Sequence, residues 1–151
     1  MAKEIERKFL VTDSSYRELA RGKREIAQGY LSTDVDATVR VRIADGRAWL
    51  TVKSRNHGAT RGEWEYEIPA ADARAMLDNC CGGRVIEKTR YLVDAGDGLT
   101  WEVDEFHGRH QGLVVAEIEL PAEDTPFRKA PFVGEEVTGD ERYYNSVLSG
   151  V

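Results

Sequence analysis

Hydrophobic and polar residues alternate along most of this chain in short segments, and alternation with a period of two is typical of β-strands. In the first such segment the ionisable residues Glu4, Glu6 and Lys8 fall on one face of the expected strand. Strands are predicted in this way at residues 3–11, 25–32, 37–44, 48–55, 62–69, 84–94, 99–106 and 112–120.

Three further segments predict short helices around these strands. They lie at residues 14–22, 70–80 and 140–149. Asp13 or Ser14 is expected to cap the first helix and Asp140 the third, because their side-chain oxygens accept hydrogen bonds from the free N–H groups of a first turn. In the second helix, Met76 and Leu77 belong to an apolar stripe that predicts packing against the sheet.

Two dipeptides, Asp45-Gly46 and Asp97-Gly98, separate consecutive strands, and Asp-Gly is typical of tight hairpin turns. The neighbouring strands are therefore expected to be antiparallel, in a mostly β (α+β) fold with a few peripheral helices. Eight strands are about the number that closes a small barrel with room for one ligand. No linker or repeat divides the sequence, so residues 1–151 are expected to form one domain.

The polar face of the predicted strands is almost purely ionic, with few of the Ser, Thr and Gln residues common on wetted sheets. Its acids are Glu4, Glu6, Glu63, Glu65, Glu67, Glu102, Asp104, Glu117 and Glu119, and its bases are Lys8, Arg40, Arg42, Lys53, Arg55, Lys88 and Arg90. One alternative is an open sheet whose charged face meets solvent. Because acids and bases are sorted onto different strands, we favour a closed eight-stranded antiparallel barrel with a charged lumen. Its apolar face would point outward, beneath helices or a partner subunit.

Composition narrows the class of protein. The chain is 41% hydrophobic and 32% charged, with a net charge of −6, which argues against a nucleic-acid-binding protein. With no apolar stretch that would serve as a signal peptide or span a bilayer, a cytoplasmic protein without a membrane partner is expected. Cys80 and Cys81 are expected to be reduced and at least half-buried, and His57, His107 and His110 to be polar loop residues.

The charged face also suggests a ligand. Carboxylates without His or Cys beside them select hard cations such as Mg²⁺ or Mn²⁺, which prefer oxygen ligands. Guanidinium groups bind phosphate oxygens in a bidentate way. The nine acids and seven bases leave an excess of two negative charges, which invites divalent cations. A small anionic substrate, a polyphosphate bound with metal, is therefore expected.

The segment Glu4-Ile5-Glu6-Arg7-Lys8 resembles the ExExK signature of the CYTH superfamily, the triphosphate tunnel metalloenzymes. Further segments resemble that family's motifs in the same order. They are TVRVRI (38–43), LTVKS (50–54), EWEYEIP (63–69), EKTRY (87–91), WEVDEF (101–106) and AEIEL (116–120). The resemblance extends from Lys3 through residues 137–145, where Tyr143, Tyr144 and Asn145 resemble the family's C-terminal pattern and suggest a helix that closes the tunnel.

The resemblance implies an eight-stranded antiparallel tunnel that binds a triphosphate with two divalent ions, Mg²⁺ or Mn²⁺. The phosphates would be held by Lys8, Arg40, Arg42, Lys53, Lys88 and Arg90. Glu4 and Glu6 would hold one metal ion, and Glu117 and Glu119, with Glu63 or Asp104, would hold or orient a second. The catalytic set would be Glu4, Glu6, Lys8, Glu117 and Glu119, around a water that attacks the terminal phosphorus.

The expected activity is metal-dependent hydrolysis of inorganic triphosphate, because the chain offers little outside the barrel to recognise a base, a sugar or a thiamine ring. The alternatives are a class IV adenylate cyclase on the same scaffold, a thiamine triphosphate or nucleoside triphosphate phosphatase, and a non-catalytic polyphosphate-binding module. A homodimer that packs barrel exteriors together is also expected, since outward apolar residues such as Ile5, Val39, Val41 and Val52 need cover.

Overall fold

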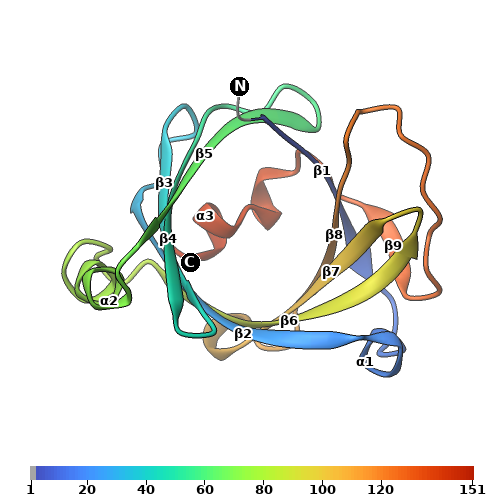
Figure 1. Ribbon diagram of the computed structural model, residues 1–151, viewed down its shortest axis with the longest axis horizontal. Helices are drawn as coiled ribbons and strands as arrows, with labels where there is room; N and C mark the ends of the chain where they lie inside the picture. Colours follow the sequence, from blue (N-terminus) through green and yellow to red (C-terminus); the bar gives the residue numbers. More distant parts are fainter. Residues whose placement is uncertain (1–2) are drawn as a thin grey trace.

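A computed structural model describes residues 3–151 and shows a β-sheet that curls round and closes on itself (Figure 1). Its strands are β1 (Lys3–Val11), β2 (Gly22–Ser32), β3 (Thr38–Ala44), β4 (Arg47–Lys53), β5 (Thr60–Ile68), β6 (Val85–Gly96), β7 (Leu99–Phe106), β8 (Val114–Glu119) and β9 (Val133–Glu136). The order is β5-β4-β3-β2-β6-β7-β8-β1-β9, and every pairing is antiparallel. An additional pairing of β5 with β1 closes strands β1 to β8 into the predicted barrel.

The ninth strand was not predicted. β9 pairs only with the second half of β1, where Phe9 faces Glu136 and Val11 faces Val133. Its sequence, VGEE, is four residues long and has a glycine and two adjacent acids, so it carries no alternation of apolar and polar residues. Long-range pairing with β1, rather than local propensity, therefore makes this segment a strand.

Both predicted hairpin turns are present. Asp45 and Gly46 have φ angles of 53° and 75°, and Asp97 and Gly98 have φ angles of 55° and 76°. Two consecutive residues in the left-handed region define the turn whose twist matches that of the flanking strands. The Asp-Gly dipeptides thus fix the register of β3 with β4 and of β6 with β7.

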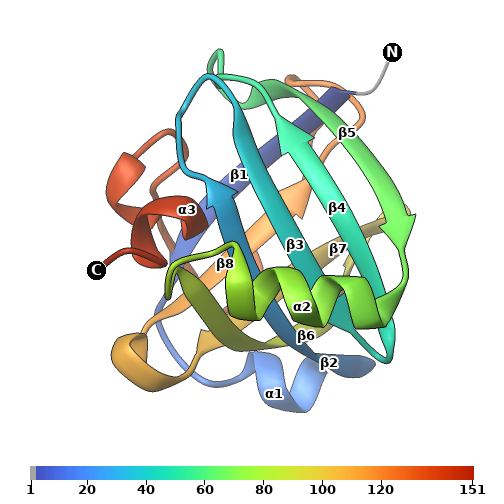
Figure 2. The ribbon, with the colours of Figure 1, turned by 90° about the vertical axis from the view of Figure 1, so that its left-hand side faces the viewer.

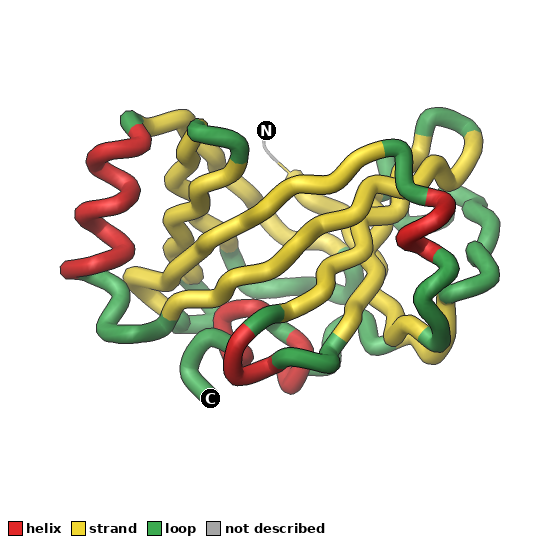
Figure 3. The backbone as a smooth tube through the Cα atoms, turned by 90° about the horizontal axis from the view of Figure 1, so that it is seen from below, coloured by secondary structure: helices red, strands yellow, loops and turns green. Residues whose placement is uncertain are grey.

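The apolar face of the barrel points outward and is covered by other segments of the chain. The largest buried cluster lies outside β1, β6, β7 and β8, beneath α1 (Tyr16–Leu19) and the segment 120–133. At its centre Trp101 packs edge-to-face against Phe9, with ring centroids 5.6 Å apart. A second cluster, between β3, β4 and α2 (Ala70–Asn79), includes Val41 and Leu77. Helices α1 and α2 lie on the outside of the strands (Figure 3).

One end of the barrel interior is apolar and is filled by the C-terminal part of the chain. Ile86, Phe106 and Val115 belong to β6, β7 and β8, and Leu148 of α3 (Asn145–Leu148) completes this cluster. α3 lies at the end of the barrel in Figure 2 and across its opening in Figure 1. The C-terminal segment therefore closes one end of the barrel.

The helices are shorter than predicted. Ser15, not Asp13 or Ser14, precedes the first helical residue of α1, and Asp13 Oδ1 accepts a hydrogen bond from the Ser15 N–H at 2.9 Å. The C-terminal helix is broken at Tyr144, whose angles are extended (φ −67°, ψ 132°), into the 3₁₀ turn η2 (Glu141–Tyr143) and α3. Asp140 accepts from the Arg142 N–H, as predicted. No helix within residues 3–151 has the length and apolar character needed to cross a membrane.

The cysteines are both free, but only one of them is buried. Cys81 is fully buried beneath α2, whereas Cys80 is exposed, so the expectation that both would be at least half-buried is wrong for Cys80. The difference arises because Cys80 caps the C-terminal end of α2 on its outer side, and the chain turns Cys81 back toward β2.

Gly29 of β2 allows α2 to approach the barrel closely. A Cβ atom at this position would lie 2.7 Å from Cys81 Sγ and 2.8 Å from Leu77 Cδ2. Gly29→Ala is therefore expected to destabilise the fold by about 1–3 kcal/mol, the usual cost of overpacking a core. Urea denaturation measures this cost. Gly22→Ala in the same strand is the control, because nothing lies within 4 Å of its Cβ position; equal stability of the two variants would contradict the prediction.

Candidate active site

The inner face of the barrel encloses a cavity of about 190 Å³. Seven acids and seven bases line it: Glu4, Glu6, Glu63, Glu65, Glu102, Glu117, Glu119, Lys8, Arg40, Arg42, Lys53, Arg61, Lys88 and Arg90. The C-terminal segment contributes Tyr144, Asn145 and Ser146 to the wall. The predicted excess of two negative charges is therefore wrong for the cavity wall, whose formal charges balance.

Three residues that the alternation placed in the lumen do not line the cavity. Glu67 forms an exposed ion pair with Arg47 at 2.7 Å, and Arg55 forms one with Asp36 at 2.6 Å. Glu67 lies on the expected face of β5 but outside the cavity, whereas Arg55 lies beyond the end of β4 at Lys53, so the strand predicted to continue to residue 55 is shorter. Asp104 is 2% exposed and lies behind the cavity wall, where lysine and arginine side chains cover it.

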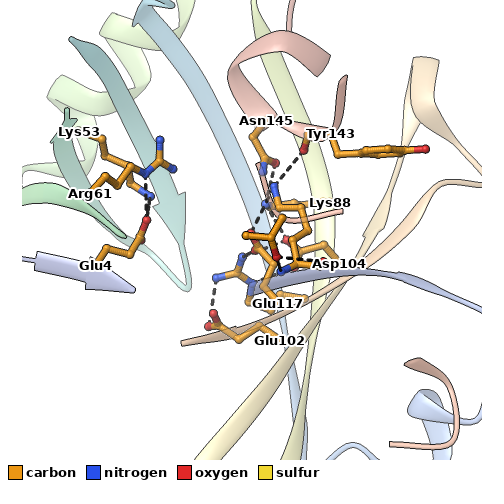
Figure 4. A network of polar contacts seen from close by, with 12 residues as sticks. Glu4, Lys53, Arg61, Lys88, Glu102, Asp104, Glu117, Tyr143 and Asn145 are labelled. Carbon is orange, nitrogen blue, oxygen red and sulfur yellow. Dashed lines mark hydrogen bonds and ion pairs between the residues drawn. The ribbon is translucent and has the colours of Figure 1, made fainter. Parts of the chain in front are cut away.

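One wall of the cavity carries a network centred on Glu4 (Figure 4). The Glu4 carboxylate accepts hydrogen bonds from Lys53 Nζ at 2.9 Å and from Arg61 Nε at 3.1 Å. Burial alone would raise the pKa of Glu4, but the two cations outweigh it and lower the pKa from 4.5 to about 2. Glu4 is thus held ionised and in a fixed position.

The opposite wall carries a larger network centred on Arg90, whose partners Glu102, Asp104 and Glu117 are labelled in Figure 4. The guanidinium binds Asp104 through Nε at 2.8 Å and Nη2 at 3.0 Å, and it reaches Glu102 at 3.1 Å and Glu117 at 3.2 Å. Lys88 Nζ lies 2.7 Å from Asp104. Since all three carboxylates share one guanidinium, Arg90 fixes the geometry of this wall.

Two lysines of the cavity are held by the C-terminal segment as well as by acids. Lys8 Nζ lies 3.5 Å from Glu117 and donates to the Tyr143 carbonyl at 2.9 Å. Lys88 Nζ donates to Asn145 Oδ1 at 3.0 Å. Burial lowers the pKa of Lys88 to about 8 despite the neighbouring Asp104. Both ammonium groups therefore point toward the closed end of the cavity.

Two arginines of β3 line the cavity with unused hydrogen-bonding capacity. Arg40 Nε is buried and has no hydrogen-bond partner within residues 3–151, although Nη2 lies 3.4 Å from Glu65. Arg42 donates to Gln28 at 2.9 Å, and burial together with Arg40 and Arg90 lowers its pKa to about 10. A buried donor without a partner is costly, so an anion that accepts from Arg40 would be favoured.

Two acids of the cavity form no ion pair with any lysine or arginine of the part of the chain that is described. Glu6 of β1 and Glu119 of β8 lie directly opposite each other in register. Burial and the charges of Glu117 and Glu4 raise the pKa of Glu6 well above its ordinary value. Burial and the charges of Glu4 and Glu63 raise the pKa of Glu119. Like charges opposed across two strands are unfavourable and invite a cation.

The donor set fits a hard divalent cation by its chemistry. Among residues 3–151, no group of three or more Asp, Glu, His or Cys side chains is placed to hold a metal ion by itself. Mg²⁺, however, usually binds through one or two carboxylates and completes its shell with waters and substrate phosphates. The opposed pair of Glu6 and Glu119 therefore fits an ion that is shared with a phosphate ligand.

Two kinds of site residue were not predicted from the sequence. Arg61 shares the face of Glu63 but precedes the predicted start of its strand at residue 62, so a longer strand would have found it. The Tyr143 carbonyl and the Asn145 amide reach the cavity from a segment without strand periodicity, and no sequence signal indicates which lysine each one contacts. His107 and His110 contact Thr89 Oγ1 and the Leu148 carbonyl, outside the cavity wall.

The Glu4 network predicts a pH dependence of stability. Because the folded-state pKa of Glu4 is about 2 against an ordinary 4.5, its stabilisation is complete above pH 4.5 and is lost as the pH falls through 2. Glu4→Gln should lower the free energy of unfolding at neutral pH by roughly 2–3 kcal/mol. In urea titrations the difference from wild type should shrink as the pH falls. A difference that stays constant with pH, or an equal effect of the exposed Glu67→Gln, would contradict this assignment.

Comparisons with known proteins identify the family of this chain and match its barrel fold. The family model for the CYTH domain matches residues 2–147. An inorganic triphosphatase from Acetivibrio thermocellus is 50% identical over 148 residues, covering 98% of this chain and 94% of that protein. An inorganic triphosphatase from Nitrosomonas europaea is 39% identical over 149 residues, covering 97% and 96%. The crystal structure of the inorganic triphosphatase NE1496 superimposes with a TM-score of 0.67 at 35% identity, covering 99% and 95%.

Proposed function

The chain belongs to the CYTH domain family, and on that premise we propose that it hydrolyses inorganic triphosphate to pyrophosphate and phosphate with the help of divalent metal. The observation that carries the proposal is a cavity that combines seven cationic side chains with an opposed, unpaired Glu6 and Glu119. Such a site suits an anion that brings its own counter-cation. Residues 1–151 would act together as one tunnel domain.

The cationic side chains are proposed to hold the phosphates. They are Lys8, Arg40, Arg42, Lys53, Lys88 and Arg90, to which we add Arg61. Arg40 offers a free buried Nε, and Lys8 and Lys88 direct their ammonium groups toward the closed end. These groups would stabilise the charge that develops on the phosphoryl oxygens during in-line attack by water.

The acids are proposed to serve the metal. Mg²⁺ or Mn²⁺ would be held first by Glu6 and Glu119; when bound, such an ion polarises phosphate oxygens and lowers the pKa of a bound water. Glu4, Glu63 and Glu117 are paired with lysine or arginine in the protein alone. Once phosphates engage those cations, these three carboxylates are released as further ligands, which suits a second ion.

Asp104 and Glu117 are proposed to have different tasks, although both were expected near a metal. Both oxygens of Asp104 bind Arg90, and Lys88 adds a third contact, so Asp104 orients the cations from behind the wall. Glu117 lines the cavity beside Lys8 and Arg90, which hold its pKa well below the ordinary value against the effect of burial. Glu117 therefore stays ionised and would be available to hold a metal ion or to orient the attacking water.

The size of the cavity favours a small substrate over a nucleotide. Its enclosed volume is about 190 Å³, and the C-terminal segment covers one end. The aromatic residues of its wall, Tyr30 and Tyr144, contact Gln28 and Lys8, respectively. Trp49 does not line the cavity, and the Arg47 guanidinium lies over its ring at 5.4 Å. We therefore propose inorganic triphosphate, rather than ATP or thiamine triphosphate, as the substrate. Because this substrate has no ribose hydroxyl, the reaction would be hydrolysis and not cyclisation.

The test is phosphate release from tripolyphosphate, ATP and pyrophosphate, each with Mg²⁺, Mn²⁺ or EDTA. We expect rapid, metal-dependent hydrolysis of tripolyphosphate and little of the other two. Cyclic AMP in the ATP reactions would instead identify a cyclase. Tight binding of tripolyphosphate without turnover in either metal would identify a binding module, and both results would overturn the proposal.

Location and assembly are also proposals. A cytoplasmic enzyme is consistent with two free cysteines.

A partner subunit was expected to cover the outward apolar residues of the barrel. Much of that cover is supplied by α2, which packs over Val41, and by the segment 120–133, which packs over Ile5. Trp64 and Tyr66 on β5 remain 41% and 62% exposed. A homodimer through β5 would cover them, and sedimentation that finds only monomer at micromolar concentration would exclude it.

A further inference from the structure

A short loop outside the cavity wall holds the C-terminal segment in place. The 3₁₀ turn η1 (Gly108–His110) connects β7 with β8. Arg109 Nη2 donates to the Ser149 carbonyl at 2.8 Å, and His110 Nε2 donates to the Leu148 carbonyl at 2.6 Å. We call this pair of residues the C-terminal latch. It bonds the carbonyls at the end of α3. Among the described residues the Ser149 carbonyl has no backbone partner, and the Leu148 carbonyl accepts only from the Val151 N–H, at 3.4 Å.

The latch is bonded to the barrel on both sides. His107 N–H donates to the Glu87 carbonyl of β6 at 3.0 Å, and Phe106 N–H of β7 donates to the Leu113 carbonyl at 3.1 Å. Below it, Leu148 is buried against Ile86, Phe106 and Val115. The position of α3 is therefore set by strands β6, β7 and β8.

The segment that the latch holds carries two acceptors for cavity lysines. The Tyr143 carbonyl accepts from Lys8 Nζ at 2.9 Å, and Asn145 Oδ1 accepts from Lys88 Nζ at 3.0 Å (Figure 4). Lysine is a flexible chain with a rotatable ammonium group, so its orientation depends on such fixed acceptors. The Tyr144 ring lies 5.9 Å from Lys8 Nζ and limits its remaining freedom.

We propose that Arg109 and His110 are positioning residues for the reaction. They fix α3, and the segment from η2 into α3 orients Lys8 through the Tyr143 carbonyl and Lys88 through Asn145. Neither latch residue lines the cavity. The inference rests on the proposed function only in that the two lysines bind triphosphate. It adds a loop outside the cavity to the residues that fix the positions of the two lysines. A displacement of such a group by about 1 Å can lower the rate by about 100-fold.

The test compares the double variant Arg109→Ala/His110→Ala with wild type in two measurements. Hydrogen exchange of the amides of residues 145–149 should become faster, while exchange in β6 stays unchanged. With tripolyphosphate and Mg²⁺, kcat/KM should fall by about 10- to 100-fold. Gln111→Ala is the matched control, because Gln111 is an exposed residue of the same loop with only a backbone hydrogen bond.

A mutant cycle distinguishes positioning from loss of structure. Asn145→Ala alone should lower kcat/KM, and adding it to the latch variant should have little further effect, since both act on Lys88. His110→Gln, which keeps a side-chain N–H donor, should restore part of the activity of His110→Ala. Losses that simply multiply would overturn the proposal, as would unchanged exchange at residues 145–149 or faster exchange with unchanged kcat/KM.

The outcome can be separated from that of the proposed function. If wild type does not hydrolyse tripolyphosphate, the proposed function fails, and the latch is then tested by calorimetric binding of tripolyphosphate in EDTA. Weaker binding by the latch variant than by Gln111→Ala would support the positioning role. Equal binding by the two variants would overturn it.

Discussion

Replacing Glu6 by glutamine is expected to abolish metal-dependent turnover and, at the same time, to stabilise the metal-free protein. Glu6 lies opposite Glu119 and has no cation partner among the described residues. Its charge is therefore useful only when metal is bound. Loss of several kcal/mol of transition-state stabilisation by metal corresponds to about a 100- to 1,000-fold lower kcat. Removing a buried charge that lies close to Glu117 and Glu4 should raise Tm by about 1–4 °C.

Two assays on one preparation of Glu6→Gln test the predicted loss of turnover and the predicted gain in thermal stability. Tripolyphosphate hydrolysis is measured with saturating Mg²⁺, and thermal unfolding is measured in EDTA. Glu67→Gln is the control, because Glu67 shares the face of the cavity acids but pairs with Arg47 outside the cavity. A Glu6→Gln protein that is less stable than wild type, or that keeps its turnover, would refute the assignment of Glu6 as an unpaired metal ligand.

Arg90→Met is expected to lose both stability and activity. Arg90 is 7% exposed and pairs with Glu102, Asp104 and Glu117, so its removal leaves buried carboxylates without their cation. Breaking a buried ion pair from one side costs about 3–5 kcal/mol. Activity should fall below detection at any temperature, because the geometry of one cavity wall depends on this guanidinium.

Three further variants sharpen the Arg90 experiment, each measured by urea denaturation and tripolyphosphate hydrolysis. Arg24 faces Arg90 directly in register but is exposed, so Arg24→Met should change stability by less than about 0.5 kcal/mol. Arg90→Lys keeps the charge without the bidentate contact and should be intermediate. Arg90→Met/Asp104→Leu should recover stability but not activity. Full activity in the double variant would show that Arg90 serves the fold alone.

The face of each strand was predictable from sequence, whereas the depth of each side chain was not. Alternation assigns Glu63, Glu65 and Glu67 to one side of β5, because successive side chains of a strand point to opposite faces. It does not say where along the barrel axis the enclosed part ends, and Glu67 lies beyond it. The same limit applies to Asp104, which is on the correct face but recessed behind Arg90.

The contribution of the C-terminal segment could be predicted only in outline. The likeness of residues 143–145 to a family pattern suggested a helix that closes the tunnel, and α3 lies across one opening. The break at Tyr144 and the contacts to Lys8 and Lys88 depend on packing against β6, β7 and β8, which local sequence does not encode. β9 is a strand for the same reason, since it exists only through its pairing with β1.

Closure of the barrel through β1 also determines at which stage of folding the active site is formed. β1 is synthesised before the other eight strands, yet its Lys8 N–H donates to Thr138 Oγ1, 130 residues later in the chain. Hairpins such as β3–β4 and β6–β7 can form locally, whereas β1 must wait for β8 and β9, and contacts of such long range make folding slow. Glu4, Glu6 and Lys8 all lie on this strand. A nascent or partly refolded chain is therefore inactive, with unpaired edges on β1 and β8 that are open to aggregation until the last pairing forms.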